Sequence, residues 1–271
     1  MQLAWPNETF PILAIEQIQD IFYFAIHNQI YSLHANDKKL NLVATIPGEM
    51  NFIRTLRAYK ENLYIGANQG LYSIDLSNTQ LVKVNLHQDI ANTADNNNVK
   101  FLTIDSQLGL LVGTVEGMYA IAFDSNNFID NSKLSTVIPD FNIWDYQKTP
   151  YGEFIATEQG LFQYYRETNS TEFVLNFSDS QFNITENTIN DLMIDDTGMF
   201  WLASRTQGIF TWAIQTRRFN KIKLLNNNVI NAVNQDKNGS FWFGTDNGIT
   251  HLSNDKKQMT TYLQSNDRKA V

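Results

Sequence analysis

The sequence contains no cysteine. Disulfide bonds, zinc sites built on thiolates and a cysteine nucleophile are therefore all excluded. A chain without cysteine is compatible with a periplasmic location but does not require one.

Basic side chains are also scarce. The 271 residues include 20 Lys and Arg against 28 Asp and Glu, which gives a net charge of −8 and a pI near 5.0. No dense basic run is available to neutralise phosphates. We therefore expect no nucleic-acid partner and no anionic-membrane surface.

Long apolar runs are missing as well. No stretch approaches 18 uninterrupted apolar residues, so we expect no membrane-spanning segment in this chain. The opening stretch "MQLAWPNETFPILAI" lacks the basic start and the long apolar core of a signal peptide. Either the protein is cytoplasmic, or the chain is a part of a longer protein.

The most informative feature that is present is a phrase repeated six times. Each copy has an apolar run, a small residue, a few polar residues, a glycine and a second apolar run. The copies read "FYFAIHNQIYSL", "LYIGANQGLYSI", "LLVGTVEGMYAI", "FIATEQGLFQY", "FWLASRTQGIFTW" and "FWFGTDNGITHL". The glycine position recurs every 40 to 48 residues, at Gln29, Gly70, Gly117, Gly160, Gly208 and Gly248. A period in the forties is typical of a β-propeller with four strands per blade.

The last copy shows why each repeat should form four strands. "SFWFGT" and "GITHL" are short, apolar and joined by a glycine turn, which predicts a hairpin. A strand over 229–235, a turn from Asp236 to Gly239 and a strand over 258–263 complete the unit. No window shows sustained helical periodicity.

We therefore predict an all-β protein, a β-propeller with six four-stranded blades in a single domain over 1–271. The six repeats span approximately 10–46, 51–87, 98–138, 141–178, 187–224 and 228–264. A closed ring is favoured, because an open array would expose strand edges and apolar faces.

Two recurring positions have structural explanations. The large residue in the second strand of each repeat should be wedged between neighbouring blades. It is Tyr23, Tyr64, Leu111, Phe154, Trp201 and Trp242. The small residue two places later should allow the close approach of another backbone. It is Ala25, Gly66, Gly113, Ala156, Ala203 and Gly244.

The pattern D-x-x-G-x-F-W-[FL]-[GA]-[ST]-x-x-x-G-[IL] resembles the two-component regulator propeller repeat. The match is sharp in "DDTGMFWLASRTQGI" and "DKNGSFWFGTDNGI", and weak in the first repeat, where Gln29 replaces the glycine. Such repeats form the sensor region of bacterial hybrid histidine kinases and of some membrane-bound diguanylate cyclases. Streptogramin-type lyases use similar repeats.

The resemblance implies a periplasmic sensor region of a membrane-anchored parent protein. Its partners would be the signalling module of that parent, a small polar ligand such as an oligosaccharide, and a second copy in a homodimer. Sensors of this kind usually have many more blades, followed by a membrane helix.

The residues themselves show no catalytic pattern. His27, His34, His87 and His251 lack the spacing of metal ligands, and nucleophile-elbow, phosphate-loop and dinucleotide motifs are absent. Asp195, Asp196 and Asp236 lie in D-x-x-G turns, where aspartate usually bonds its own backbone. We expect no catalysis, no cofactor and no metal site.

Function is therefore expected on the propeller face formed by the loops that precede the innermost strands and by the glycine turns. The candidate ligand-binding residues of the channel and of this face are Arg54, Lys100, Trp144, Asn190, Arg205 and Asn231. Amide, guanidinium and indole groups suit a sugar or another polar molecule. The alternative is that these side chains are only solvated.

Three functions remain open at this stage. The favoured one is a sensor that binds a ligand or partner outside the cytoplasm. The second is a scaffold for protein–protein contacts. The third is a lyase-like metal-dependent enzyme, for which we find no suitable pair of histidine and carboxylate.

Overall fold

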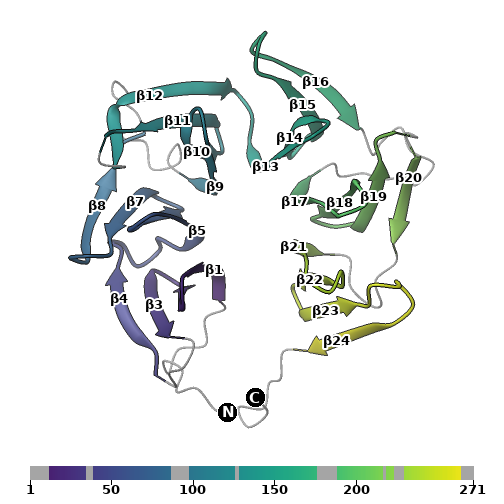
Figure 1. Ribbon diagram of the computed structural model, residues 1–271, viewed down its shortest axis with the longest axis horizontal. Coiled ribbons are helices and arrows are strands. Elements are labelled where there is room, and N and C mark those ends of the chain that lie inside the picture. Colours follow the sequence, from purple (N-terminus) through teal and green to yellow (C-terminus); the bar gives the residue numbers. More distant parts are fainter. Residues whose placement is uncertain are drawn as a thin grey trace. The chain divides into compact units, whose positions relative to one another are not determined.

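A computed structural model describes residues 12–34, 39–86, 98–125, 128–175, 188–215, 218–222 and 229–263. Every regular element in these ranges is a β-strand, and no helix there is long and apolar enough to cross a membrane. The strands form six four-stranded antiparallel sheets, each from four consecutive strands (Figure 1). The predicted all-β fold with six propeller blades is confirmed.

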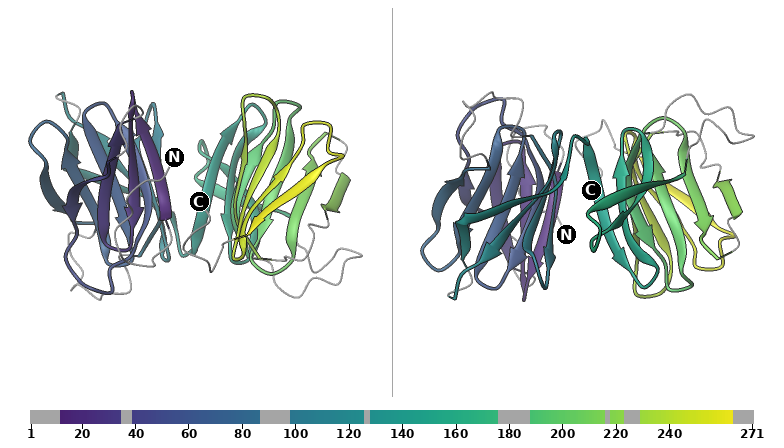
Figure 2. Two further views of the ribbon diagram at one scale, coloured as in Figure 1. Left: turned by 90° about the horizontal axis from the view of Figure 1, so that it is seen from below. Right: turned by 90° about the horizontal axis from the view of Figure 1, so that it is seen from above.

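The chain divides into two compact units, residues 1–143 and 144–271. Closure of the ring and the single domain stay predictions. In each unit the strands run between two ends where the connecting loops gather (Figure 2).

The first unit contains three blades. The first is β1 (Ile12–Ile18), β2 (Ile21–Ile26), β3 (Gln29–His34) and β4 (Asn41–Thr45). The second is β5 (Ile53–Tyr59), β6 (Asn62–Ala67), β7 (Gly70–Asp75) and β8 (Gln80–Val84). The third is β9 (Val99–Asp105), β10 (Gly109–Thr114), β11 (Gly117–Phe123) and β12 (Ile129–Pro139).

The second unit contains the other three. The fourth blade is β13 (Ile143–Thr149), β14 (Gly152–Thr157), β15 (Gly160–Tyr165) and β16 (Ser170–Leu175). The fifth is β17 (Ile189–Ile194), β18 (Met199–Ser204), β19 (Gly208–Ala213) and β20 (Arg218–Ile222). The sixth is β21 (Ile230–Gln235), β22 (Phe241–Thr245), β23 (Gly248–Leu252) and β24 (Met259–Leu263).

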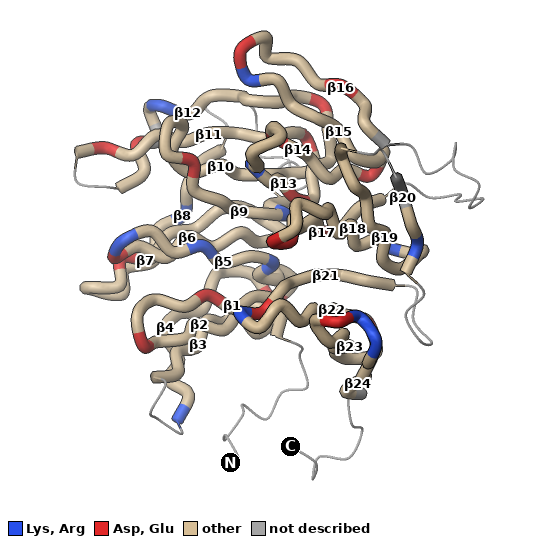
Figure 3. Tube along the Cα trace, turned by 45° about the vertical axis from the view of Figure 1, so that its right-hand side comes forward, with Lys and Arg blue, Asp and Glu red and all other residues tan. Residues whose placement is uncertain are grey.

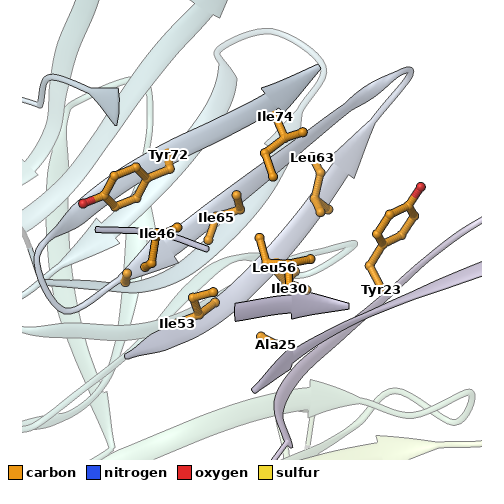
Figure 4. Close-up of a cluster of buried hydrophobic side chains, with 11 residues drawn as sticks. Tyr23, Ala25, Ile30, Ile46, Ile53, Leu56, Leu63, Ile65, Tyr72 and Ile74 are labelled. Atoms are coloured by element: carbon orange, nitrogen blue, oxygen red, sulfur yellow. The ribbon is translucent and has the colours of Figure 1, made fainter. Parts of the chain in front are cut away.

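The large residues of the second strands join neighbouring blades, as predicted, in four cases. Tyr23 packs with Ile53, Leu56 and Leu63 of the second blade in an aliphatic cluster (Figure 4). Trp201 is fully buried and stacks on Phe241 of the sixth blade, with 4.0 Å between the ring centroids. Tyr64 and Phe154 likewise belong to clusters that include residues of the following blade. Trp242 is half-buried and lies against His251 of its own sheet.

The D-x-x-G turn has a second role that the sequence did not reveal. Asp195 Oδ1 accepts the backbone N–H groups of Thr197 and Met199, which is the expected local bonding. Its Oδ2 accepts a hydrogen bond from Trp201 Nε1 at 2.9 Å. Asp236 and Trp242 repeat the same bond at 2.9 Å. The aspartate therefore holds the indole six residues later in its rotamer, which explains why both residues recur together.

We predicted that another backbone approaches the small residue of each second strand. At Gly66 and Gly113 this prediction was wrong, because the nearest atoms belong to side chains. A Cβ on Gly113 would lie 1.8 Å from Phe101 Cε1, and one on Gly66 would lie 2.5 Å from Val99 Cγ1. The reason is that bulky side chains of the innermost strands fill the space above these glycines. At Gly244 the nearest atom is the Cβ of Ala232 at 3.5 Å, which leaves room for a methyl group.

Within each unit, side chains also connect neighbouring innermost strands. Glu16 Oε1 of β1 accepts the N–H of Ala58 at 3.2 Å, and Arg57 Nε of β5 donates to the carbonyl of Leu102 at 3.2 Å. These bonds replace the backbone ladder that is missing between separate sheets. These bonds tie β1 to β5 and β5 to β9.

We expect Trp201→Ala to lower the free energy of unfolding by about 3–5 kcal/mol, because it opens a cavity between two sheets. Urea denaturation measures this change. Tyr262→Ala is the control, since this side chain is 54% exposed and should matter little. Equal losses in the two variants would contradict the wedge between blades.

Gly113→Ala and Gly244→Ala form a matched pair. The methyl group at 113 collides with the ring of Phe101 and should cost about 1–3 kcal/mol. The one at 244 meets ordinary van der Waals contact, so its effect should stay within about 1 kcal/mol. Melting temperatures of the two variants provide the comparison, and a tolerated alanine at 113 would refute the steric explanation.

Candidate functional site

The second residue of the innermost strand is an inserted residue in most blades. In β5, Ile53 and Thr55 pair with the consecutive residues Ala67 and Gly66, which leaves Arg54 as the bulge. The same shift leaves Lys100 in β9, Asn190 in β17 and Asn231 in β21 as bulges, and Trp144 is the second residue of β13. A bulge redirects a side chain and is frequent beside functional sites. Five of the six predicted site residues therefore occupy equivalent positions.

In the second unit, Trp144 and Arg205 lie together. The guanidinium carbon of Arg205 is 6.0 Å from the centroid of the Trp144 ring, within range of a cation–π interaction. Arg205 is exposed, in the turn between β18 and β19, and Trp144 is half-buried. The pair presents a fixed charge next to an aromatic surface.

The two predicted asparagines of this unit are also neighbours. Asn190 Nδ2 donates to the carbonyl of Ile230 at 3.0 Å and lies 3.5 Å from Asn231 Oδ1. Asn231 Nδ2 in turn donates to Asp246 Oδ1 at 2.7 Å. This chain of bonds orients amide groups from the fifth and sixth blades. We call Trp144, Asn190, Arg205, Asn231 and Asp246 the polar rim.

Two buried oxygens, one in the polar rim and one in the residue after Arg205, have no hydrogen-bond partner among the described residues. They are Asn190 Oδ1 and the hydroxyl of Thr206, the residue that follows Arg205. Buried polar atoms are satisfied in the great majority of cases. Unsatisfied oxygens here favour a site that receives donors from a ligand or from water.

Arg54 and Lys100 belong to the first unit. Arg54 is exposed, and its Nε donates to Asn68 Oδ1 in the adjacent glycine turn at 2.5 Å. Lys100 is half-buried on β9. The structure thus brings four predicted residues together in the second unit as two pairs, while these two cations lie in the other unit.

Two functional candidates were missed, the carboxyl groups of Asp145 and Asp191. Asp191 Oδ2 accepts the N–H of Val233 at 2.7 Å, and Asp145 Oδ2 accepts the N–H of Leu192 at 3.1 Å. Asp191 follows the bulge residue Asn190 on β17, and Asp145 follows Trp144 on β13. Burial, the charge of Asp145 and a hydrogen bond to it raise the pKa of Asp191 well above its ordinary value. The charge of Asp145 therefore favours the protonated form of Asp191.

The signal for this pair was present in the sequence but weak. The stretch "PDFNIWDYQ" is unusually polar for an inner strand and contains Asp145. Asp191 lies at the same place in the next repeat. No sequence rule indicates that the two carboxyl groups touch, because they are 46 residues apart.

Two of the described histidines contact neighbouring side chains. His251 lies on Trp242, with 4.4 Å between the centroids, and His27 Nδ1 is 2.9 Å from Asn28 Oδ1. His87 lies outside the described residues. Among the residues that are described, no group of three His, Asp or Glu side chains could hold a metal ion.

Comparison with known proteins identifies the repeat. The model of the two-component regulator propeller family matches residues 224–247, the region of the sixth repeat. The resemblance to two-component regulator propellers is confirmed. No sequence match is found among curated proteins.

Solved structures share the fold of these propeller repeats. The extracellular domain of BT3049 from B. thetaiotaomicron, described as a hybrid two component system, is 16% identical with a TM-score of 0.73. The alignment covers 96% of this chain and 36% of that one. The extracellular domain of BT4673 from B. thetaiotaomicron, described in the same way, is 19% identical with a TM-score of 0.70, over 92% of this chain and 33% of that one. The chain thus spans about a third of these relatives.

A lyase also shares the fold. Virginiamycin B lyase from Staphylococcus aureus is 10% identical with a TM-score of 0.69, over 96% of this chain and 87% of that one. At these identities the likeness concerns the fold alone. The choice between sensor and enzyme must come from the side chains.

The raised pKa of Asp191 has a consequence for stability. The folded state binds a proton that the unfolded chain releases near pH 4. The contribution of Asp191 to the free energy of unfolding therefore declines as pH rises from about 4 toward the raised pKa.

Asp191→Asn should abolish this decline and leave the variant at least as stable as the natural chain at neutral pH. The amide keeps an acceptor for Val233 and a donor for Asp145. Urea midpoints between pH 5 and 8 measure the effect. Asp196→Asn, at an exposed position, is the control and should keep the original pH dependence of stability. The same pH dependence in Asp191→Asn would disprove the raised pKa of Asp191.

Proposed function

We propose that this chain is the sensor propeller of a bacterial membrane-bound signalling protein, located outside the cytoplasm and without catalysis of its own. The two-component regulator propeller repeat and the fold shared with extracellular domains of two component systems support this role. The proposed partners are a small polar ligand, the signalling module of the parent protein and a second copy of the chain.

The polar rim is the proposed ligand site, and one observation carries it. An exposed guanidinium lies over an indole ring, next to two buried oxygens that lack donors. Aromatic surfaces and planar amide or guanidinium groups suit a ligand that has both hydroxyl groups and apolar ring faces. An oligosaccharide is the ligand class that fits these groups best.

The enzyme alternative is favoured by one observation, the fold that the chain shares with a lyase. Against it, His251 and His27 each contact an aromatic or amide side chain, and neither lies in a group of three potential metal ligands among the described residues. A scaffold for protein contacts remains the runner-up, because the fold alone permits it.

A thermal-shift screen with neutral oligosaccharides, amino acids and Mg²⁺ tests the proposal. A ligand at a hundred times its Kd adds about 2.7 kcal/mol to the free energy of unfolding, which raises the melting temperature measurably. We expect an oligosaccharide to give this shift, and Arg205→Ala and Trp144→Ala to remove it. Arg205 is exposed, so its variant should fold normally.

Tyr262→Ala is the matched control, because it removes an exposed aromatic side chain of the same unit outside the polar rim. It should retain the ligand-induced shift. A shift with Mg²⁺ alone would favour the enzyme, and no shift with any compound would favour the scaffold. Either result would overturn the sensor proposal.

A further inference from the structure

A groove in the first unit shares no residue with the polar rim. It has a volume of about 410 Å³ and runs between the loop after β4 and the outer strands of the second blade. Its lining residues are Pro47, Gly48, Gln69, Tyr72, Leu81 and Lys83. Sites for small molecules in proteins commonly have volumes of a few hundred Å³.

A buried asparagine builds the wall of this groove. Asn51 is fully buried, and its Nδ2 donates to the carbonyl of Pro47 at 2.9 Å and to the hydroxyl of Tyr72 at 3.0 Å. Its Oδ1 accepts the N–H of Gln69 at 2.9 Å. One side chain thus fixes three of the lining residues, so the groove is formed before any ligand arrives.

Glycine is required at position 48. Its φ of +94° lies in the left-handed region, and a Cβ there would come within 3.1 Å of Gln69 Oε1. A larger residue would both strain the loop and press on the groove wall. The open shape therefore depends on this residue.

The fifth blade offers an internal comparison, because the equivalent lysine has side-chain partners there. Tyr72 pairs with Lys83 across β7 and β8, as Phe210 pairs with Lys221 across β19 and β20. Lys221 Nζ donates to Gln207 Oε1 at 3.3 Å and lies 5.5 Å from the Phe210 ring. In the second blade Lys83 is exposed and has no partner among the described residues.

The chemistry of the groove is that of an anion site with an apolar wall. Lys83 is its one charged lining residue, and Pro47 and Leu81 are apolar. The hydroxyl of Tyr72 accepts from Asn51, so its own proton is available to donate, and Figure 4 shows this hydroxyl directed away from the aliphatic cluster. Burial raises the pKa of Tyr72, which keeps the phenol protonated.

We propose that this groove binds a small organic carboxylate with an apolar body, its carboxylate on Lys83 and Tyr72 and its body against Pro47 and Leu81. A charge-assisted hydrogen bond is stronger than a neutral one, so the anion is preferred over its neutral analogue. This site is separate from the polar rim and does not depend on the proposed sensor function.

Phenylacetate is a suitable probe, and phenylacetamide is its neutral analogue. Ligand-detected NMR titrations should give a Kd of about 1 mM for phenylacetate, in the range of a fragment-sized ligand. Lys83→Gln should weaken binding about tenfold, the loss expected for one charge-assisted bond. Phenylacetamide should bind the natural chain as weakly as phenylacetate binds this variant.

Lys221→Gln is the matched control, because it removes the equivalent lysine of the fifth blade, which has its own partners in Gln207 and the Phe210 ring. It should leave the binding of phenylacetate unchanged. Equal weakening in both variants, equal binding of the amide, or no saturable binding of phenylacetate would each overturn the proposal. Melting temperatures within a few degrees of the natural chain establish that both variants are folded.

Discussion

The insertion of one aromatic side chain between successive sheets is the contact on which this structure depends. A four-stranded sheet has two faces and cannot bury both by itself. Trp201 shows how such a face is buried. Its ring projects from its own sheet and stacks on Phe241 of the next sheet, and its Nε1 donates a hydrogen bond to Asp195. Tyr23, Tyr64 and Phe154 also pack in clusters that include residues of the following blade. Repetition of this contact explains why the chain repeats the phrase at all.

The innermost strands depend on a different, polar kind of contact. Side chains such as Glu16 and Asp191 accept backbone N–H groups from the next blade, where no sheet ladder can form. The bulge residue Asn190 directly precedes Asp191. On β17 a candidate binding residue, Asn190, therefore stands next to a residue that bonds to the neighbouring strand, Asp191. Charged side chains are otherwise scattered over the described part of the chain, without a continuous basic stretch (Figure 3).

Equivalent positions in the blades have diverged although the backbone is the same. The lysine on the outer strand is held by a glutamine and a phenylalanine ring in the fifth blade, and it is solvated beside an open groove in the second. In the second blade, Gly48 and Asn51 of the loop between two blades shape this groove. Repeat architecture thus allows one fold to carry several distinct surfaces, since a loop can change without disturbing the sheets.

The sequence by itself determined the fold class, the number of blades and four of the large residues that wedge between blades, because hydrophobic alternation and turn glycines act within a few residues. Asp195 and Asp236 were correctly placed in turns, but their bonds to tryptophan were not foreseen. Only the tertiary structure decided which side chains meet across blades: Arg205 over Trp144, Asp145 beside Asp191, and Val99 above Gly66. These contacts join residues that are far apart in the chain, and their geometry depends on how the sheets pack, which no local pattern encodes.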